Sequence, residues 1–422
     1  RAYVQSALSM KILVIALNYA PEPIGCAKYT SQLCVELAKK YSHDVRVYSA
    51  APYYPDWKTY QEYRAFRAKN VYLNNVLVTR MRIYVPKRPN AFNRLIHLLS
   101  FSVRLLFQVP NMLLFKPNVV VVILPTLVSV PIAKLICFLS KARLHIHVQD
   151  LEFGVINSIS NTQRKLFTLR ALTKTIFSTL ERSLIKMADS LSTISNTMQR
   201  QIRNILDEPN RRIPIVRNWY DNPTIDKTDY FSKLRAGRKI ALYSGALGRK
   251  QGLDIILQAA RELQTNKHCH DWLFIIAGDG AAKEMLVRKC KQFALKNVIF
   301  CDLFPDEHYL SAFSSADIHI VPQLSGVSDF VLPSKLSTLW GLGCKTIVAA
   351  SATSEISSIH REFPGICDVY EPEDLTSLLG AIDAAPDKHF DKEVCISYAR
   401  NFLDKDKNIR NLHSEINYLN EK

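Results

Sequence analysis

The sequence predicts an α/β protein of two parallel-sheet domains, and three observations lead to this prediction. Short apolar segments alternate with helical patterns along most of the 422 residues. The apolar segments are nearly continuous, as in strands that are buried on both faces of a sheet. The alternation occurs twice, in two series that meet near residue 218. Strands that alternate with helices form doubly wound parallel sheets, so each series predicts one domain.

The first series begins with the apolar run KILVIALNY. A helical pattern follows it, with Leu33, Leu37 and Ala38 on one side. Four further apolar runs come after this helix. We therefore expect a helix at 28–40 and strands at 11–19, 44–50, 119–125, 144–150 and 190–195.

The second series starts after the segment PIVRNWYDNP. Its clearest helix carries apolar residues at helical spacing from Leu253 to Leu263. We expect helices at 253–263 and 283–295 and strands at 239–245, 272–280, 298–305, 317–323 and 345–350. Two similar halves suggest two facing Rossmann-like domains, in which ligands bind beyond the carboxyl ends of the strands.

The same patterns suggest the domain boundaries. Residues 1–9 carry neither a strand pattern nor a long apolar core, so we expect a leader or vector-derived segment and not a signal peptide. The first domain is expected over 10–217 and the second over 218–400. The charged residues 401–422 are expected to form a C-terminal helix that packs back on the first domain.

Composition narrows the classes of partner. The net charge of +17 points to polyanions: nucleic acid, an acidic membrane or phosphorylated substrates. No RRM, zinc-finger or helix-turn-helix signature is present, so we expect no nucleic-acid partner. Nine cysteines without a CxxC pair are typical of a reduced, cytosolic chain. The uncharged stretch 119–133 is broken by Pro125 and Pro131 and is too short to cross a bilayer.

Residues 84–117 mix leucine and phenylalanine with lysine and arginine. A basic amphipathic segment of this kind can lie in an anionic lipid surface. It can equally be a pair of core helices with basic edges. The sequence leaves both interpretations open.

The segment YSGALGRKQGLD, residues 243–254, predicts an anion site. A glycine turn between a strand and a helix exposes backbone N–H groups and the positive end of the helix dipole. Arg249 and Lys250 add two cations, which suit a phosphate or diphosphate. The turn lacks the P-loop pattern, and no G-x-G-x-x-G follows the first strand, which counts against a nicotinamide-dependent dehydrogenase. An ordinary α/β turn with two solvated cations remains the alternative.

Several motifs in a fixed order give the chain a family resemblance from Met10 to about residue 400. They are NYAPEPIG, SAAPYYPDW, HVQDLE, VRNWYD, YSGALGRKQGLD, IIAGDG, ADIHIVP and VLPSKL. In this combination the chain resembles the retaining GT4 glycosyltransferases of the GT-B fold, two facing Rossmann-like domains with a cleft between them. It is most similar to the subgroup that builds bacterial O-antigen, capsule and colanic acid.

The resemblance implies roles for the residues that match the family's motifs. The first domain would bind the acceptor, and the second would hold the nucleotide sugar with its diphosphate at the glycine turn. Arg249 and Lys250 would act in catalysis as the available cations, together with Asp150, which ends the HVQD strand and could instead cap a helix. His145 and His147 share one strand face and are candidates for a base, or are structural.

The remaining implied donor contacts are spread over both halves. Many relatives carry a Glu pair near residue 330, which binds sugar and ribose; here Asp329 could replace the first glutamate, and Thr338 lies near the second. Gln251 stands where many members have lysine. The full set of implied donor contacts is Gly25, Asn218, Gly245, Gln251, Gly278, Gly280, Asp329, Lys335 and Thr338.

The implied function is transfer of a sugar from a nucleoside diphosphate, UDP in preference to GDP, to a polyprenyl-diphosphate-linked saccharide. Fixed cations and N–H dipoles would stabilise the departing diphosphate. Front-face departure, with a donor phosphate oxygen taking the acceptor proton, fits the absence of a clear covalent nucleophile. No cofactor or metal is implied, and Asp404–Asp406, the only D-x-D, is expected on a solvated helix face. We expect a cytoplasmic enzyme seated on the inner face of the cell membrane through 84–117.

Two other functions remain open at this stage. A nucleotide-sugar 2-epimerase of the same fold would need no acceptor. A non-catalytic, membrane-associated partner of a glycosyltransferase complex would explain the missing Glu pair. Fold analogy alone separates none of the three.

Overall fold

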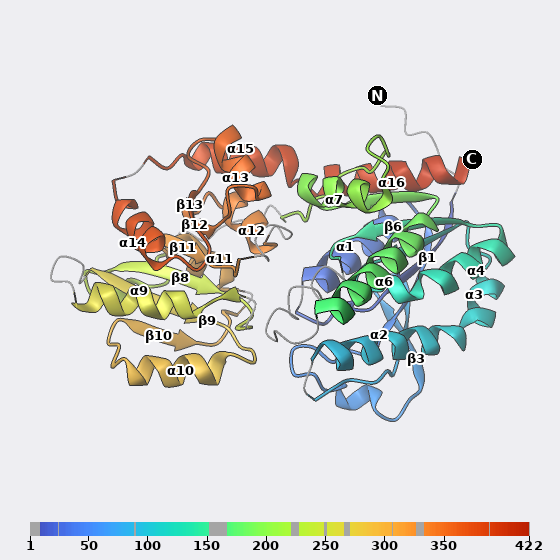
Figure 1. Ribbon diagram of the computed structural model, residues 1–422, viewed down its shortest axis with the longest axis horizontal. Helices are drawn as coiled ribbons and strands as arrows, with labels where there is room; N and C mark the ends of the chain where they lie inside the picture. The colour runs from blue at the N-terminus through green and yellow to red at the C-terminus, as the bar shows by residue number, and fades with distance from the viewer. Residues whose placement is uncertain are drawn as a thin grey trace. The chain divides into compact units, whose positions relative to one another are not determined.

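The chain forms two compact units in a computed structural model (Figure 1). Unit 1 comprises Arg1–Arg217 and Asn408–Lys422, and unit 2 comprises Asn218–Lys407. The structure describes residues 9–23, 25–87, 90–151, 167–220, 228–248, 251–265, 271–305, 307–325, 333–387 and 389–421.

Unit 1 is built on a seven-stranded sheet in the order β3-β4-β2-β1-β5-β6-β7. The strands are β1 (Lys11–Ala16), β2 (Asp44–Ala50), β3 (Ala68–Leu73), β4 (Val76–Met81), β5 (Val119–Ile123), β6 (Arg143–Val148) and β7 (Ser190–Thr193). All neighbours pair in parallel except the edge strand β3, which runs antiparallel to β4. The chain order reverses between β1 and β5, the place where ligands bind in sheets of this kind.

Helices and short 3-10 turns surround this sheet. They are α1 (Gly25–Lys39), η1 (Gln61–Tyr63), α2 (Ala91–Leu106), α3 (Val109–Phe115), η2 (Leu127–Ser129), α4 (Val130–Ser140), α6 (Phe167–Lys186), α7 (Asn196–Leu206) and α16 (Lys405–Glu421). Every residue of the run VVVVI in β5 is buried, as expected for a strand covered on both faces.

Unit 2 has a six-stranded, all-parallel sheet in the order β10-β9-β8-β11-β12-β13. Its strands are β8 (Lys239–Ser244), β9 (Trp272–Ala277), β10 (Val298–Cys301), β11 (Ile318–Val321), β12 (Thr346–Ala349) and β13 (Asp368–Tyr370). Successive residues of β8 face two separate hydrophobic cores: Ile240 and Leu242 face one, and Ala241 and Tyr243 the other. The chain order reverses between β8 and β11.

Helices cover both faces of the second sheet. They are α8 (Ser232–Arg235), α9 (Asp254–Thr265), α10 (Lys283–Gln292), α11 (Tyr309–Ser315), α12 (Lys335–Gly341), α13 (Glu355–Glu362), α14 (Leu375–Ala384) and α15 (Lys392–Phe402). Two doubly wound parallel-sheet units confirm the predicted fold class.

Helix α16 completes unit 1 although it follows unit 2 in the chain. The side chain of Asn408 accepts a hydrogen bond from the Arg217 backbone at 2.8 Å. Farther along, Nε2 of His413 lies 2.9 Å from Nε2 of His43 in a buried contact. Arg212 forms an ion pair with the buried carboxylate of Glu415 at 3.1 Å. The helix is therefore part of the hydrogen-bonded structure of this unit.

The segment 84–117 forms α2 and α3 in unit 1. Among the described residues no single helix is long and apolar enough to span a membrane. Helices α2 and α3 are long and apolar enough only if they are taken together as one segment. That segment is bent by 55° at the break between the two helices. His97, Phe101 and Leu105 form the buried side of α2.

Candidate functional site

Two loops meet at the carboxyl end of the unit 2 sheet. The Gly245 N–H donates to the Ala277 carbonyl at 2.9 Å, and the Leu247 N–H donates to the Asp279 carbonyl at 2.8 Å. The Leu247 carbonyl in turn accepts from the Ala282 N–H at 2.8 Å. These bonds fix the turn after β8 against the loop after β9.

Two glycines after β9 permit this close approach. A Cβ on Gly278 would lie 2.0 Å from the Gly245 carbonyl oxygen, and one on Gly280 would lie 2.7 Å from the Leu247 oxygen. Their φ angles of +147° and +149° also favour glycine. Gly278 and Gly280 therefore contribute to the site by allowing the backbones of the two loops to pack closely.

Lys335 points at the same turn from the start of α12. Its Nζ lies 3.9 Å from the centre of the Tyr243 ring and 3.2 Å from the position a Cβ on Gly245 would take. No acidic side chain of the described residues pairs with this ammonium. Burial without a counter-charge lowers the pKa of Lys335 to about 7. An enclosed ammonium without a counter-charge is expected to attract an anionic ligand.

The local sequence explains the position of Lys335. Leu336, Leu339 and Trp340 are buried and hold α12 against the unit 2 core. The indole N–H of Trp340 donates to the Thr346 hydroxyl at 3.2 Å, which ties the helix to β12. Thr338 lies three residues after Lys335 and therefore on the same face of the helix.

Two side-chain amides near this turn have unused polar atoms. Gln323 follows β11 and is buried, yet among the described residues neither its Oε1 nor its Nε2 has a hydrogen-bond partner. Oε1 of Gln251 also lacks one. Buried polar atoms without partners are rare, and a bound ligand is one way to satisfy them. Gln323 was not among the residues expected from the sequence, although a polar residue at the carboxyl end of an apolar strand was its signal.

Three predicted site residues lie outside the described part of the chain: Arg249, Lys250 and Asp329. Asn218 is the first residue of unit 2 and is partly exposed. The structure thus brings together Gly245, Gln251, Gly278, Gly280 and Lys335 from the predicted donor contacts, with Tyr243 and Gln323 as additions.

The corresponding edge of unit 1 carries Asp150, partly exposed after β6, and Gly25, which begins α1. The carboxyl groups of Glu22 and Asp150 both contribute to raising the pKa of the Cys26 thiol to about 12, after burial as the main cause. The loops after β1 and β6 therefore lie close together, on either side of the switch between β1 and β5.

Glu22 is a second residue that sequence reasoning missed. Its carboxylate accepts hydrogen bonds from the Tyr53 N–H at 3.1 Å, the Tyr54 N–H at 3.0 Å and the Asn18 amide at 3.0 Å. Burial raises its pKa, and these hydrogen bonds oppose that rise. Glu22 thus joins the loops after β1 and β2.

His145 and His147, the candidate bases, are buried in β6. Their rings bond to the hydroxyls of Ser190 and Ser192 on the neighbouring strand at 2.6–2.8 Å. Burial lowers the pKa of His145 to about 3 and that of His147 to about 4, so both rings are neutral near pH 7. This geometry offers both histidines a structural role, and a role as base stays a prediction.

Within the described residues, no group of three His, Cys, Asp or Glu side chains is arranged to hold a metal ion. The Asp404 carboxylate accepts a hydrogen bond from the Lys407 N–H at 2.7 Å, as at the start of a helix.

Comparisons with known proteins agree with this architecture. Residues 25–219 match the family described as "Glycosyl transferase 4-like domain", and residues 225–329 match the family described as "Glycosyl transferases group 1". A curated protein of Escherichia coli (strain K12), the putative colanic acid biosynthesis glycosyl transferase WcaI, is 33% identical over 414 residues. That alignment covers 96% of this chain and 100% of the relative.

Solved structures share the fold at low identity. Sucrose-phosphate synthase from Thermosynechococcus elongatus aligns with a TM-score of 0.69 at 13% identity, covering 97% of this chain and 99% of that one. Anabaena HepE in complex with UDP-glucose aligns with a TM-score of 0.64 at 13% identity, covering 96% and 99%. Together with the identity to the curated relative over nearly the whole chain, these matches show that the chain belongs to the GT4 glycosyltransferases of the GT-B fold.

Proposed function

We propose that this glycosyltransferase takes its sugar from a nucleoside-diphosphate donor whose diphosphate binds at the Gly245 turn of unit 2. The observation that carries the proposal is Lys335, a largely enclosed ammonium that faces the glycine turn without an acidic partner among the described residues. A diphosphate supplies the missing negative charge. Oε1 of Gln251 and both amide atoms of Gln323, which have no hydrogen-bond partner among the described residues, supply polar contacts for the rest of the donor.

The proposed chemistry relies on stabilising the leaving group. Negative charge grows on the diphosphate as its bond to the anomeric carbon breaks, and the Lys335 ammonium is already in place beside the turn. Arg249 and Lys250 follow the turn directly in sequence and are proposed as further cations. We propose that the acceptor attacks the face from which the diphosphate leaves, so that the anomeric configuration is retained. Asp150 is proposed to contact the donor sugar or the acceptor.

We propose UDP as the donor nucleotide, with GDP as the second candidate. The support is a neighbour in fold, Anabaena HepE, whose structure was determined in complex with UDP-glucose. Gly25, Asn218 and Thr338 are proposed as additional donor contacts. No metal or other cofactor enters the proposed reaction.

The proposed acceptor is a polyprenyl-diphosphate-linked saccharide in bacterial surface polysaccharide synthesis. The support is the curated relative, whose name assigns it to colanic acid biosynthesis. A lipid-linked acceptor would place the enzyme in the cytoplasm at the inner face of the cell membrane, seated through residues 84–117.

Product analysis tests the proposal against the two other functions. The purified protein is incubated with UDP-sugars or GDP-sugars, with and without a polyprenyl-diphosphate-linked disaccharide, and nucleotide and lipid products are separated by mass. We expect UDP release and an acceptor heavier by one sugar, only when the acceptor is present. Conversion of the nucleotide sugar without acceptor would identify an epimerase. Nucleotide binding without any turnover, across the panel, would identify a non-catalytic partner.

The anomeric outcome has its own measurement. NMR of the extended acceptor gives the configuration of the new glycosidic bond, which we expect to match that of the donor. Inversion would contradict the front-face mechanism without affecting the assignment of the donor site.

A further inference from the structure

The hydrophobic residues that unit 1 exposes are concentrated on one group of helices. Among the large apolar side chains that are exposed, nine lie on α2, α3, α4 or the link between the first two: Phe92, Leu99, Val103, Leu106, Phe107, Leu114, Leu135, Phe138 and Leu139. We call these nine residues the apolar surface. The three helices are neighbours, because α4 packs against both α2 and α3 (Figure 1).

Helix α2 shows why this surface is unusual. Phe92, Leu99, Val103 and Leu106 recur at spacings of seven, four and three residues, so they lie on one side of the helix. The opposite side carries the buried residues His97, Phe101 and Leu105. A helix that is apolar on both sides needs an apolar partner on each, and the sheet supplies only one.

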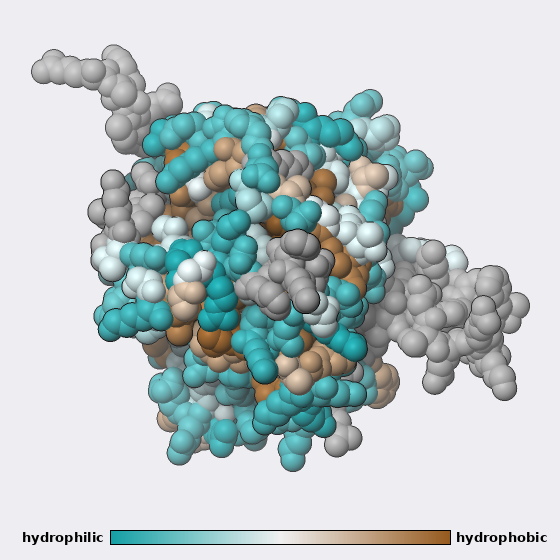
Figure 2. Space-filling model, turned by 90° about the vertical axis from the view of Figure 1, so that its left-hand side faces the viewer, coloured by the Kyte–Doolittle hydropathy of each residue, from teal (hydrophilic) through white to brown (hydrophobic). Residues whose placement is uncertain are grey.

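Helix α4 repeats the arrangement. Leu135, Phe138 and Leu139 are exposed at the spacing i, i+3, i+4, and Phe138 is 80% exposed. Figure 2 gives the contrast: the side of the molecule at α9, α10 and α14 is mostly hydrophilic, with only small hydrophobic groups. Contiguous apolar patches on a protein surface mark sites of protein or membrane contact.

The charge of this region favours a membrane over a protein as the partner. No aspartate or glutamate occurs between Glu62 and Asp150, while the same 87 residues contain 13 lysines and arginines. An apolar surface in an acid-free, strongly basic segment complements an anionic lipid bilayer, whose headgroups attract cations and whose acyl region accepts apolar side chains.

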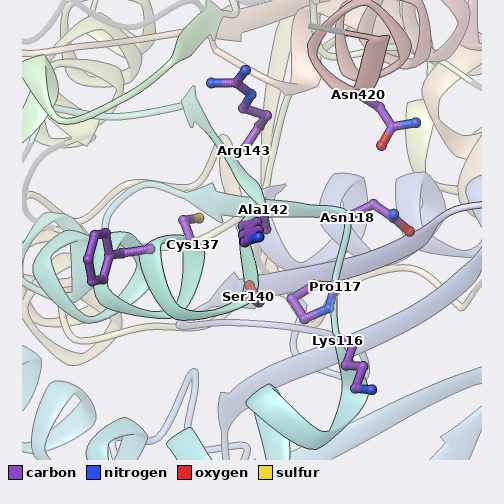
Figure 3. A pocket seen from close by; sticks show the side chains of 10 residues that line it. Lys116, Pro117, Asn118, Cys137, Ser140, Ala142, Arg143 and Asn420 are labelled. Carbon is purple, nitrogen blue, oxygen red and sulfur yellow. The ribbon is translucent and has the colours of Figure 1, made fainter.

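A pocket of about 700 Å³ lies beside the apolar surface, at the ends of α3 and α4 where β5 and β6 begin (Figure 3). Its polar lining consists of Lys116, Asn118, Ser140, Lys141, Arg143 and Asn420. Phe138 belongs to both the pocket and the apolar surface. In Figure 3, Lys116 comes from the segment that leads into β5, Arg143 begins β6, and Asn420 comes from α16.

The three cations of this pocket are available for a ligand. Lys116, Lys141 and Arg143 are exposed, and in the part of the chain that the structure describes no acidic side chain pairs with any of them. Lys116 and Lys141 also occupy left-handed positions at the ends of α3 and α4, with φ of 53° and 61°, where glycine is the common choice. Two lysines and an arginine around one hollow suit a phosphate group.

We propose that this pocket binds the phosphate of an anionic phospholipid headgroup while the apolar surface enters the outer part of the same bilayer leaflet. A free phosphate ion would use the cations but would leave the nine exposed apolar side chains unexplained. A phospholipid uses both features. The inference rests on the proposed membrane location of the enzyme and is independent of its sugar-transfer chemistry.

The topology gives this surface a direction. Helix α2 follows the carboxyl end of β4, and α3 ends just before the amino end of β5. The apolar surface therefore extends along the sheet from its carboxyl edge, where Asp150 lies, to its amino edge, where the pocket lies. A bilayer contact along this line would hold a lipid-linked acceptor beside the edge of unit 1 that carries Asp150.

Vesicle flotation of the full-length protein tests the proposal. Vesicles of phosphatidylcholine alone are compared with vesicles in which part of this lipid is replaced by phosphatidylglycerol. We expect binding to the second kind only, weakened by salt. The variant Lys116→Ala/Lys141→Ala/Arg143→Ala should bind about a hundredfold more weakly, since each cation near an anionic surface contributes roughly a factor of five.

A matched control separates the pocket from net charge. The variant Lys233→Ala/Lys291→Ala/Lys296→Ala removes the same charge from exposed positions of unit 2 and should bind almost as well as the wild type. Equal losses in the two variants would overturn the pocket assignment. The variant Phe138→Ser/Leu139→Ser keeps the charge and should also lose binding; wild-type binding by this variant would overturn insertion of the apolar surface.

Inorganic phosphate tests the source of the phosphate group. If the pocket holds the lipid phosphate, inorganic phosphate should displace the protein from phosphatidylglycerol vesicles more strongly than sodium chloride of equal ionic strength does, and equal displacement by the two salts would overturn the pocket assignment. Thermal stabilisation by inorganic phosphate in a protein that floats with neither kind of vesicle would make the pocket a site for free phosphate and overturn the lipid assignment. Thermal unfolding with UDP is measured on the same proteins. A UDP shift that survives in the pocket variant shows that its fold and donor site are intact. Vesicle binding without a UDP shift in the wild type would sink the donor proposal and leave this one standing.

Discussion

The ammonium of Lys335 lies 3.9 Å from the centre of the Tyr243 ring, beside the turn that begins at Gly245. The ring gives the cation a favourable partner through its π-system, but one that carries no charge. The hydroxyl of Tyr243 donates to the Ala246 carbonyl at 2.7 Å, so the ring itself is fixed by the turn. The lysine is thus held in place before any ligand arrives.

Replacing this lysine should have opposite effects on stability and on binding. Lys335→Met keeps the length of the side chain and removes an enclosed charge, so the ligand-free variant should be more stable by ~1 kcal/mol. Saturating UDP should stabilise the wild type by about 2.7 kcal/mol at 100 times its Kd and the variant hardly at all. Thermal unfolding with UDP, GDP and CMP measures both effects. Lys291→Met, on the exposed side of α10, is the control and should keep the full UDP shift. An undiminished UDP shift in Lys335→Met would remove Lys335 from the donor site.

The pKa of Lys335 predicts how nucleotide binding depends on pH. Burial lowers this pKa to about 7, and a bound diphosphate would raise it by favouring the charged form. Binding then includes uptake of a proton above pH 7, so the affinity for UDP should fall as pH rises, by about tenfold per pH unit at most. Titration calorimetry between pH 6 and pH 9 measures how the affinity for UDP changes with pH. Repeating it in buffers of different ionisation enthalpy measures how many protons are taken up on binding. A slope that is the same in Lys335→Met would assign the effect to another group.

Gly278 offers a test of the backbone packing at the turn. An alanine Cβ would lie 2.0 Å from the Gly245 carbonyl oxygen at a φ of +147°. Gly278→Ala should therefore cost about 3 kcal/mol of stability and weaken UDP binding, because the turn has to move. Gly237→Ala is the matched control: its φ is +81°, but nothing lies within 4 Å of the added Cβ. It should cost about 1 kcal/mol and leave UDP binding intact. Urea unfolding and the UDP shift report the two quantities, and equal losses in both variants would contradict the packing argument.

Buried histidines should make the protein sensitive to acid. Burial lowers the pKa of His145 to about 3 and those of His147, His319 and His413 to about 4, from an ordinary value of 6.5. The unfolded chain therefore binds more protons than the folded one below pH 6.5, and stability falls as pH drops from 6.5 toward 4. At pH 5 each such histidine should cost ~2 kcal/mol.

Urea midpoints at pH 7, 6 and 5, followed by circular dichroism, measure this loss. His319, whose Nε2 lies 2.8 Å from the Phe313 carbonyl oxygen, gives a variant for comparison. His319→Gln should be less stable at pH 7 but should lose less between pH 7 and pH 5 than the wild type. A stability that is unchanged down to pH 5 in the wild type would contradict the neutral, buried state of these rings.

Much of the architecture could be predicted because continuous apolar runs identify strands that are covered on both faces. The run 44–50 is a strand with the predicted bounds, whereas 272–280 ends at Ala277, since Gly278 begins the packed turn. The β3–β4 hairpin was missed although the sequence carries a signal for it, the adjacent pair Asn74 and Asn75. These two residues have φ of 50° and 70°, as a two-residue hairpin turn requires. Strand β13 has three residues, too few for any periodicity.

The candidate site was less predictable because its parts meet only through the fold. Lys335 and Gly245 were both expected from motifs, but their proximity depends on the packing of α12. Gln323 looked like the end of an apolar strand, and only its burial and its unpartnered amide distinguish it. The two histidines of β6 looked like candidate bases because a period of two puts them on one face; their partners, Ser190 and Ser192, come from a strand about 45 residues later.

Unit 1 is built from two separate parts of the chain, and this has a practical consequence for experiments that separate the two units. The chain passes from unit 1 to unit 2 after Arg217 and returns before Asn408. A single proteolytic cut between 221 and 227 would give two polypeptides, and the second would still carry α16, which packs on residues 10–217 without a covalent bond. Expression of residues 10–217 alone would leave His43 without its contact to His413 and Arg212 without its ion pair to Glu415. A folded unit 1 should therefore require the C-terminal helix, supplied either through a short artificial linker or as a separate peptide.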